Sequence, residues 1–550
     1  MGVGRSPTGS IDPSVTGIRD DLAESLRRAL REVGVEPPEV VRLERPARRE
    51  HGDWSSNVAL ASAKAAGRPP RDLAQALADA LNADPPRHLV RAEIAGPGFV
   101  NFQLDPGWLH DVLREVVTAG VESYARHDVG RGIRVNCEFV SANPTGPLHA
   151  GGGRWAAYGD ALANVLERCG FETHREYYLN DRGNQLDAFA ASLEARKKGL
   201  PLPPDGYHGQ YIIDWAAEMP DDADPKEWGY QRCQRDLHDV LARMGVEFDT
   251  WFSEREMDEQ GGIAATLDEL KDHGATYEAD GAIWLRSTDY GDEKDRVLVK
   301  SNGDYTYVLP DVAYHRDKFE RGFNLLIDVW GADHHGYVNR LKAGVIALGH
   351  DPAELEIVLG QFVTLMRGGA EISMGQRSGE LVELADVLDE VGPDATRLTF
   401  LLQSIDTRQS FDIEEVRAQS MENPVFYVQY AYARIASMSR VAAERGVERR
   451  PLDEADLSLL THDRELDLLR TLEELPDVVL NACVERAPHK VATWVRKLAG
   501  DFHGFYHDCW VLGEGISPEL TQARLWLVEA SRIGLSIGLD LLGVHAPESM

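Results

Sequence analysis

A loop rich in glycine and proline, with one histidine, carries the clearest chemistry in this sequence. It runs Ser141-Ala-Asn-Pro-Thr-Gly-Pro-Leu-His-Ala-Gly-Gly-Gly-Arg154, between an alternating apolar run at 133–140 and an amphipathic run at 155–166. This order predicts a strand, a loop and a helix. Backbone N–H groups and the positive start of the helix would face an anion there, so His149 and the glycines after it are placed where ATP phosphates would lie. The alternative for such a loop taken alone is a tight turn from strand to helix.

Carboxylates and imidazoles stand out in two further places. Glu138 lies between Cys137 and Val140 in an apolar strand, where an unpaired charge is costly, so we expect a site residue rather than a solvated surface charge. A second apolar run leads into Gly331-Ala-Asp-His-His335. Imidazoles and a carboxylate suit a divalent metal, but adjacent side chains rarely converge on one ion. We therefore expect a ligand-binding loop and no metal site.

Aromatic side chains recur at helical spacing near the end of the chain. Tyr427 and Tyr430 are three residues apart, and Tyr506 and Trp510 are four apart, so each pair shares one helix face. Such rings can stack on unpaired nucleic-acid bases, or they can belong to the core of a helix bundle. Periodicity alone leaves both interpretations open.

The elements that must position these residues form several domains, since 550 residues are too many for one core. Residues 1–13 have a flexible composition. Residues 14–105 alternate helices (18–33, 71–81) with strands (40–43, 90–94) and form a compact α+β domain. An α/β nucleotide-binding domain follows at 106–400, with further buried strands at 324–331 and 355–359 and an insertion at about 187–300 that we expect to be short of strands. Residues 401–550 are predicted to form a stem and a helical domain, with amphipathic helices dominating from about 415 onward.

Composition limits the functions that are possible. Asp and Glu total 91 against 58 Lys and Arg, which gives a net charge of −33, and only 11 of the cations are lysine. Such a charge opposes nucleic-acid binding, unless salt screens it. Enrichment in carboxylates with few lysines indicates adaptation to a salt-rich cytoplasm. The five scattered cysteines include no C-x-x-C pair, which argues against a zinc ribbon. We also expect no membrane span and no signal peptide.

Several separated motifs together resemble one family. The loop segment His149-Ala-Gly-Gly152 resembles the "HIGH" signature of class I aminoacyl-tRNA synthetases. Four other segments are similar to motifs of the arginyl-tRNA synthetases, and they run through most of the chain: His51-Gly-Asp-Trp-Ser-Ser-Asn57, Arg175-Glu-Tyr-Tyr-Leu-Asn-Asp181, Asn423-Pro-Val-Phe-Tyr-Val-Gln-Tyr430 and Leu541-Leu-Gly-Val-His-Ala-Pro-Glu-Ser-Met550.

The resemblance implies a Rossmann-type parallel-sheet catalytic core with an N-terminal α+β domain and a C-terminal all-α bundle. It also implies roles for individual residues. Arginine is held by carboxylates and polar groups, since a guanidinium needs acidic partners: Glu138, Ser141, Asn143, Tyr307 and Asp311. ATP contacts fall on Pro147, His149, Gly152, Gly331, Asp333, His334, Met374 and Arg377, and the catalytic set is His149, Gly151, Gly152 and Arg377. Transfer-RNA contacts fall on Asn57, Tyr427, Tyr430, Tyr506, Trp510 and Met550.

Both class I signatures depart from the family pattern. Gly152 replaces the second histidine of the first signature. In the segment matching "KMSKS", Ser373 and Gln376 replace both lysines, which leaves Arg377 as the cation of that loop. Arg154 and Lys300 are the alternative cations for the departing pyrophosphate.

The activity implied is ligation of L-arginine to tRNA(Arg) through an arginyl-adenylate, using ATP with Mg²⁺ as a substrate complex. The expected partners are tRNA(Arg), arginine and ATP, and the protein is expected to be a cytoplasmic monomer. Two other functions stay open. One is a relative that binds tRNA or arginine without charging it, and the other is a class I enzyme for another amino acid.

Overall fold

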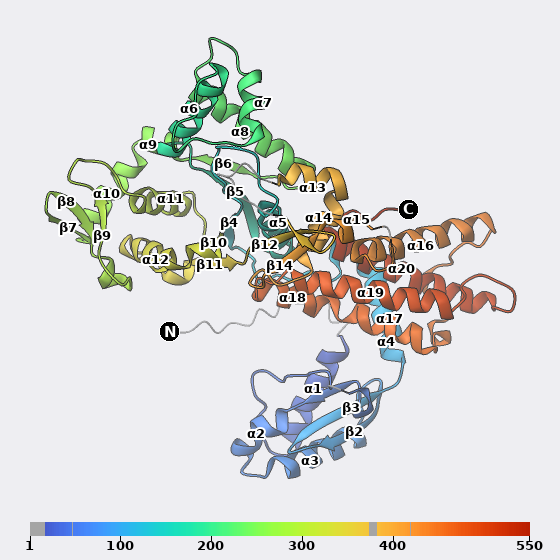
Figure 1. Cartoon of the computed structure of the whole chain (residues 1–550). Helices are drawn as coiled ribbons and strands as arrows, with labels where there is room; N and C mark the ends of the chain where they lie inside the picture. The colour runs from blue at the N-terminus through green and yellow to red at the C-terminus, as the bar shows by residue number, and fades with distance from the viewer. Residues whose placement is uncertain (1–16, 47, 373–381, 419, 550) are drawn as a thin grey trace. The chain divides into compact units, whose positions relative to one another are not determined.

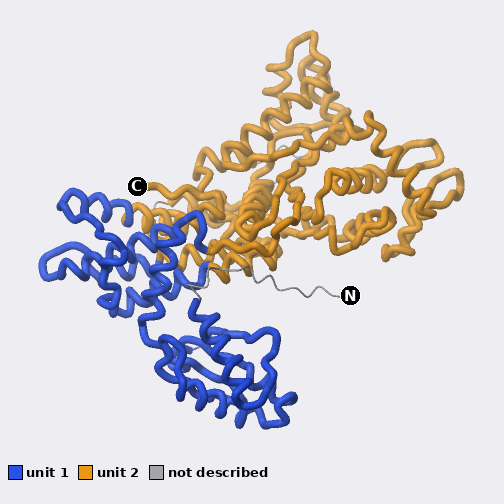
Figure 2. Tube along the Cα trace, turned by 180° about the vertical axis from the view of Figure 1, so that it is seen from behind, with its two compact units in different colours: residues 1–124, 435–475, 500–534 blue, residues 125–434, 476–499, 535–550 orange. Residues whose placement is uncertain are grey.

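The computed structural model describes residues 17–46, 48–372, 382–418 and 420–549. It divides the chain into two compact units, coloured separately in Figure 2. Unit 1 contains residues 1–124, 435–475 and 500–534, and unit 2 contains residues 125–434, 476–499 and 535–550. Each unit therefore combines segments from distant parts of the sequence.

The N-terminal part of unit 1 is an α+β domain with its own apolar core. Its antiparallel sheet has the order β1-β3-β2, and the three helices α1 to α3 pack against it (Figure 1). The elements are α1 Ile18–Glu32, β1 Trp54–Ser56, α2 Val58–Ala66, α3 Pro70–Ala83, β2 Leu89–Ala95 and β3 Phe99–Leu104. Both predicted helices and the strand at 90–94 are confirmed. The predicted strand at 40–43 is wrong: the chain makes only an isolated bridge there, between Glu44 and Ser55.

The core of unit 2 is a parallel five-stranded sheet of order β11-β10-β4-β5-β6. Its strands are β4 Arg134–Glu138, β5 Glu172–Leu179, β6 Thr250–Ser253, β10 Leu325–Gly331 and β11 Leu355–Gly360, and the helices α5 Gly152–Arg168, α11 Val308–Glu320 and α12 Val338–Ala347 connect or follow them. The strands expected from buried apolar runs at 133–140, 324–331 and 355–359 are all present. The expected Rossmann-type core is therefore confirmed.

The segment between β5 and α11 differs from expectation, because it contains four strands. One of them, β6, joins the core sheet, and β7, β8 and β9 form a separate antiparallel sheet. The expectation of a strand-poor insertion is wrong because each strand has only four residues, too few for a clear alternating pattern. The remaining elements of this segment are α6 Asn184–Lys197, α7 Gln210–Glu218, α8 Pro225–Arg243, α9 Glu254–Glu259, α10 Gly262–Asp272, β7 Thr276–Ala279, β8 Ala282–Leu285 and β9 Arg296–Val299.

After β11, a small three-stranded sheet precedes a helical C-terminal region, as expected. Here the elements are β12 Val363–Arg367, β13 Ala370–Glu371, α13 Leu384–Val391, α14 Pro393–Leu401, β14 Gln409–Asp412 and α15 Ile413–Arg417. The C-terminal helices are α16 Pro424–Glu444, α17 Asp463–Glu473, α18 Leu475–Val484, α19 His489–Asp508 and α20 Pro518–Leu541. Helix α4 (Gly107–Ser123) packs against α17 within unit 1.

In the part of the chain that the structure describes, every helix is too short or too polar to cross a membrane.

Candidate active site

The order of the core sheet marks the expected ligand position. Strand β4 is central, the chain continues through β5 and β6 on one side, and it then returns to place β10 and β11 on the other side. The direction of winding therefore reverses between β4 and β10. In open α/β sheets, ligands bind at the carboxyl ends of the strands beside such a reversal.

Two adjoining cavities lie at this edge of unit 2. The smaller has a volume of about 250 Å³ and is lined by the ends of β4 and β10, including Glu138 and Trp330. The larger has a volume of about 890 Å³ and is lined by the glycine-rich loop, by α5 and by the inserted segment. Val140, Asn143 and Trp155 line both cavities. The arrangement suits a substrate with a small specific part and a larger extended part.

His149 is poised as a neutral hydrogen-bond donor in the larger cavity. Its Nδ1 accepts from the backbone N–H of Gly151 at 2.8 Å, so the ring proton lies on Nε2. Burial lowers the pKa of His149, which favours this uncharged form. The backbone N–H groups of residues 152–154 donate to carbonyl groups within the same turn. The available donor is thus the imidazole, rather than the bare backbone N–H groups expected from the sequence.

The inserted segment contacts the glycine-rich loop at three places. Asn143 donates to Oε1 of Gln185 at 2.7 Å. The Tyr211 hydroxyl donates to the carbonyl of Thr145 at 3.0 Å, and the Cys233 thiol lies 3.2 Å from the carbonyl of Gly146. Helices α6, α7 and α8 therefore each support the loop that carries His149.

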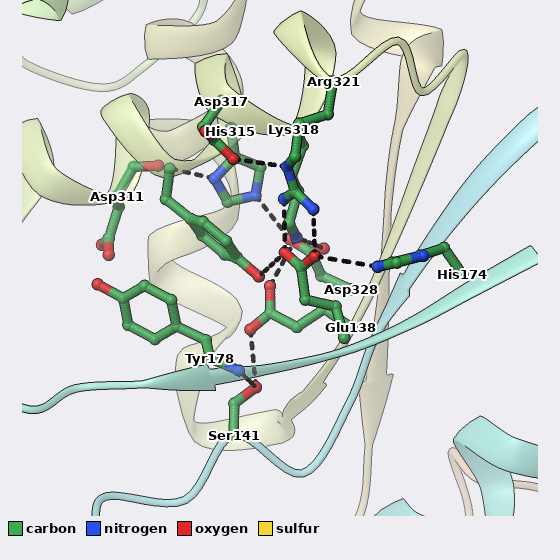
Figure 3. A network of polar contacts seen from close by, with 12 residues as sticks. Glu138, Ser141, His174, Tyr178, Asp311, His315, Asp317, Lys318, Arg321 and Asp328 are labelled. Atoms are coloured by element: carbon green, nitrogen blue, oxygen red, sulfur yellow. Dashed lines mark hydrogen bonds and ion pairs between the residues drawn. The ribbon is translucent and has the colours of Figure 1, made fainter. Parts of the chain in front are cut away.

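Glu138 is buried, as expected, but it already has a cationic partner. Its Oε2 lies 2.7 Å from Nζ of Lys318, whose side chain is completely buried, and its Oε1 accepts from the Ser141 hydroxyl at 2.9 Å (Figure 3). Ser141 Oγ also accepts from the backbone N–H of Tyr178 at 3.1 Å. Burial raises the pKa of Glu138, and the Lys318 charge opposes that rise. This internal ion pair was not expected from the sequence.

Asp311 has a different environment, although it lines the same small cavity. Its carboxylate accepts a hydrogen bond from the Tyr337 hydroxyl, and among the described residues no cationic group forms an ion pair with it. Burial raises the pKa of Asp311 to about 7. Tyr307, the residue immediately before α11, is 78% exposed and lies outside this cavity. Asp311 is thus the carboxylate best placed to take a cationic ligand.

The other residues expected to contact ATP are distributed around the two cavities. Pro147 and Gly152 line the larger cavity, and Gly331 and His334 line the smaller one. Asp333 lies 3.6 Å from His334 in the turn after β10. Met374 and Arg377 lie outside the described residues. Arg154, an alternative cation for pyrophosphate, is buried and donates to the carbonyl groups of residues 361, 404 and 407.

The residues expected to contact tRNA are found in both units. In unit 1, Tyr506 and Trp510 are 42% and 63% exposed and line a cavity of about 310 Å³, which favours a binding surface over a bundle core. The expected shared helix face is wrong for this pair, because α19 ends at Asp508 and Trp510 lies beyond it. In unit 2, Tyr427 and Tyr430 are half-buried, and Arg434 lies 4.3 Å from the centre of the Tyr430 ring. Asn57 immediately precedes α2 in unit 1. Met550 lies outside the described residues.

Sequence reasoning did not identify the charged groups beneath the small cavity. Lys318 contacts Asp328 as well as Glu138, and His315 Nε2 lies 2.7 Å from Asp328 Oδ2. A lysine usually lies at the surface, so the residue type at position 318 did not predict burial. A signal was nevertheless present: positions 311, 315 and 318 follow helical spacing and share one face of α11.

Family models match three parts of the chain. The arginyl tRNA synthetase N terminal domain matches residues 20–104, the catalytic domain of "tRNA synthetases class I (R)" matches residues 229–427, and the DALR anticodon binding domain matches residues 428–550.

Full-length relatives and solved structures agree with these matches. An arginine–tRNA ligase of Carboxydothermus hydrogenoformans is 43% identical, over 97% of this chain and 99% of its own length. One of Frankia alni is 46% identical with the same coverage. A solved structure of a putative arginyl-tRNA synthetase from Campylobacter jejuni is 33% identical, with a TM-score of 0.73 over 81% of this chain and all of the other. This chain belongs to the arginyl-tRNA synthetase family of class I aminoacyl-tRNA synthetases.

Proposed function

We propose that this chain ligates L-arginine to tRNA(Arg) with ATP. The arginine carboxylate attacks the α-phosphorus of ATP, which forms arginyl-adenylate and releases pyrophosphate. A hydroxyl of the terminal tRNA ribose then attacks the arginyl carbonyl and releases AMP. The structural observation that carries the proposal is the buried Asp311 carboxylate, which lines a cavity at the sheet reversal and has no cationic partner among the described residues.

Arginine is assigned to the smaller cavity. A guanidinium is always charged and offers paired N–H donors, so it suits a carboxylate shielded from water. Asp311 supplies the charge, and Glu138 supplies a second, oriented carboxylate. Ser141 and Asn143 are assigned to the α-amino end, and Tyr307 is assigned to arginine through the family pattern only. The cavity volume of about 250 Å³ fits one amino acid rather than a nucleotide.

ATP, as its Mg²⁺ complex, is assigned to the larger cavity. His149 Nε2 would donate to a phosphate oxygen as negative charge develops in the transition state. Pro147, Gly151 and Gly152 would form the surface under the phosphates. Contacts to the adenosine side are assigned to Gly331, Asp333 and His334.

The pyrophosphate is assigned to Arg377, and Met374 of the same signature segment is assigned to ATP. An arginine keeps its charge and can bind two phosphate oxygens at once. Arg377→Ala should therefore slow activation while arginine affinity is retained.

The tRNA is assigned to aromatic and polar side chains in both units, with bases stacked on rings. The residues are Asn57, Tyr427, Tyr430, Tyr506, Trp510 and Met550. We further propose the domain bounds 14–105, 106–400 and 401–550, a monomeric state, and a cytoplasmic, salt-rich setting. The low lysine content supports the last point.

Charging of tRNA with labelled arginine across a salt series tests the function directly. The wild-type chain should charge tRNA(Arg) and catalyse pyrophosphate exchange when tRNA is present. Replacing His149 with Ala should slow activation by about 2–4 kcal/mol in barrier, the scale of one lost transition-state donor. The matched control is His507→Ala, since His507 has a side chain 87% exposed on α19. Arginine or tRNA binding without any charging at every salt concentration would instead support a non-catalytic relative.

A further inference from the structure

A buried charge cluster lies directly beneath the small cavity and has no assigned role. Glu138 on β4 and Asp328 on β10 are register partners across the parallel strand pair. Both side chains are nearly or fully buried. Two carboxylates this close in a medium of low polarity cannot both stay ionised without a cation, because each raises the pKa of the other.

Lys318 supplies that cation from the helix above the sheet. Its Nζ lies 2.7 Å from Glu138 Oε2 and 2.9 Å from Asp328 Oδ1 (Figure 3). Burial acts to lower the pKa of Lys318, but the carboxylates of Asp328, Glu138 and Glu176 outweigh it and raise that pKa. Lys318 therefore stays charged at a position where it contacts a carboxylate from each of the two strands.

His315, one helical turn before Lys318, contacts the second carboxylate of the cluster. Its Nε2 lies 2.7 Å from Asp328 Oδ2, and its Nδ1 lies 2.7 Å from the carbonyl oxygen of Asp311. The ring therefore bridges Asp328 and the backbone of α11. Burial acts to raise the pKa of Asp328, but its contacts with Lys318 and His315 outweigh burial and lower that pKa to about 2.

The remaining charged groups of the cluster are paired elsewhere. Glu176 on β5 accepts from Arg321 at 2.6 and 2.8 Å, and from the Tyr314 hydroxyl at 2.8 Å. Arg321 also pairs with Asp317 at 2.6 Å. This leaves Asp311, whose carboxylate points away from Lys318 in Figure 3, as the carboxylate in the lining of the small cavity that lacks a positive partner in the described structure.

We propose that Lys318 is a positioning residue that sets the charge and geometry of the amino-acid pocket through Glu138. It holds one oxygen of Glu138, so that the other stays fixed against Ser141 at the wall of the small cavity. Its charge also offsets that of Glu138, so that Asp311 is the carboxylate of the described cavity lining that is left without a cation. An unpaired carboxylate beside a paired one suits the guanidinium of arginine, which brings one positive charge to the cavity. This inference rests on the proposed assignment of arginine to that cavity.

Replacing Lys318 with Met keeps the length of the side chain and removes the charge. The Glu138 carboxylate would then lose its orientation and, with Asp328, would favour taking up a proton. We expect the KM for arginine to rise at least tenfold in the charging assay, while kcat and the KM for ATP change less than threefold. The matched control is Lys271→Met, because Lys271 is 43% exposed on α10 and pairs with Asp268 at the surface. That variant should behave as wild type.

A double-mutant cycle with Glu138→Gln separates a positioning role from a general structural one. If Lys318 acts through Glu138, adding Lys318→Met to Glu138→Gln should raise the KM for arginine less than twofold further. The double variant also leaves Asp328 paired with His315, so it keeps the comparison possible even if the single variant fails to fold.

Two results would overturn the inference. One is a wild-type KM for arginine in folded Lys318→Met. The other is a tenfold additional rise in the double variant over Glu138→Gln alone. Failure of the wild-type chain to charge arginine would overturn the proposed function instead, so the two failures are distinguishable.

Discussion

Val140 and Ser141 lie where β4 leaves the sheet, and both have positive φ angles, of 69° and 40°. This conformation is strained for any side chain, and most of all for a β-branched one, at a cost of about 1–3 kcal/mol. It turns the chain so that Glu138 and Ser141 face one cavity while Asn143 reaches both. Residue chemistry at this site therefore depends on a backbone shape that neither residue type favours.

The ionisation of Asp311 should control arginine use. Its pKa of about 7 means that the carboxylate is lost as the pH falls through neutrality, and a guanidinium then loses its charged partner. We expect the KM for arginine to be constant above about pH 8 and to rise tenfold for each pH unit below about 7. Initial rates of charging across this range measure it.

Two variants check the assignment to Asp311. Asp311→Asn should abolish the pH dependence of the KM for arginine. At high pH it should weaken the apparent binding free energy of arginine by about 2–4 kcal/mol. Tyr337→Phe should shift this pH dependence upward, because the Tyr337 hydroxyl lowers the pKa of Asp311. A pH-independent KM in the wild-type chain would contradict the assignment.

Trp510 should contribute to tRNA affinity and not to stability, because 63% of its surface is exposed. Trp510→Ala should weaken tRNA binding by about 1–3 kcal/mol, the value of one stacked base. Filter binding at fixed salt measures it. The comparison is Trp494→Ala on α19, the helix that ends two residues before Trp510: Trp494 is 3% exposed, and its loss should cost about 3–5 kcal/mol of stability. If Trp510→Ala lowers Tm and leaves tRNA affinity unchanged, Trp510 stabilises the fold and does not bind tRNA.

At the scale of elements, sequence patterns identified the long or strongly apolar segments and missed the short ones. Strand β4 lies in an alternating apolar run, and β10 and β11 are mostly apolar, so they were predictable, whereas four-residue strands such as β6 have too little pattern. The residues of the candidate site were likewise predicted only in part. Glu138, Ser141, Asn143 and Asp311 were predicted and do line one cavity. Lys318 was not, because its burial depends on pairing across elements 180 residues apart.

Helix α14 shows how a buried ion ties distant elements of unit 2 together. Arg397 is 1% exposed, pairs with Asp160 of α5, and donates to the carbonyl groups of Met244 and Leu542. Arg397→Met should lower the free energy of unfolding by about 3–5 kcal/mol, because it leaves the Asp160 carboxylate buried without that partner. Urea unfolding measures it.

The control for this prediction is Arg417→Met on α15, where the side chain is 58% exposed and the loss should be below about 0.5 kcal/mol. Adding Asp160→Asn to Arg397→Met should restore part of the stability. If Arg397→Met and Arg417→Met have the same free energy of unfolding, the buried Arg397–Asp160 pair contributes nothing to stability.

At the scale of the molecule, a net charge of −33 makes self-repulsion a property of the whole chain. Salt shortens the reach of this repulsion from about 10 Å at 0.1 M to about 3 Å at 1 M. The same salt weakens contacts with tRNA phosphates. Stability and tRNA affinity should therefore respond to salt in opposite directions.

Thermal unfolding in a KCl series tests the effect on stability. We expect Tm to rise steadily between about 0.1 and 2 M KCl, as repulsion between carboxylates is screened. Sucrose at matched osmolality is the control, because it changes water activity without screening charge. A Tm that is flat or falling in KCl would show that the acidic surface is not a source of instability.

Unit 1 is assembled from segments far apart in the chain, and the ribosome makes these segments at different times. Residues 17–104 contain their own core and can fold as soon as they emerge. Helix α4 cannot complete its packing then: the Tyr124 hydroxyl that follows it bonds to the carbonyl of Leu472, 348 residues later. At roughly 5–20 residues per second, this partner arrives on the order of half a minute after α4. During that interval the apolar face of α4, which includes Trp108 and Leu113, is not yet packed against α17. A nascent chain of this protein is therefore a natural client for a chaperone that shields one amphipathic helix, and chains truncated before α17 should aggregate.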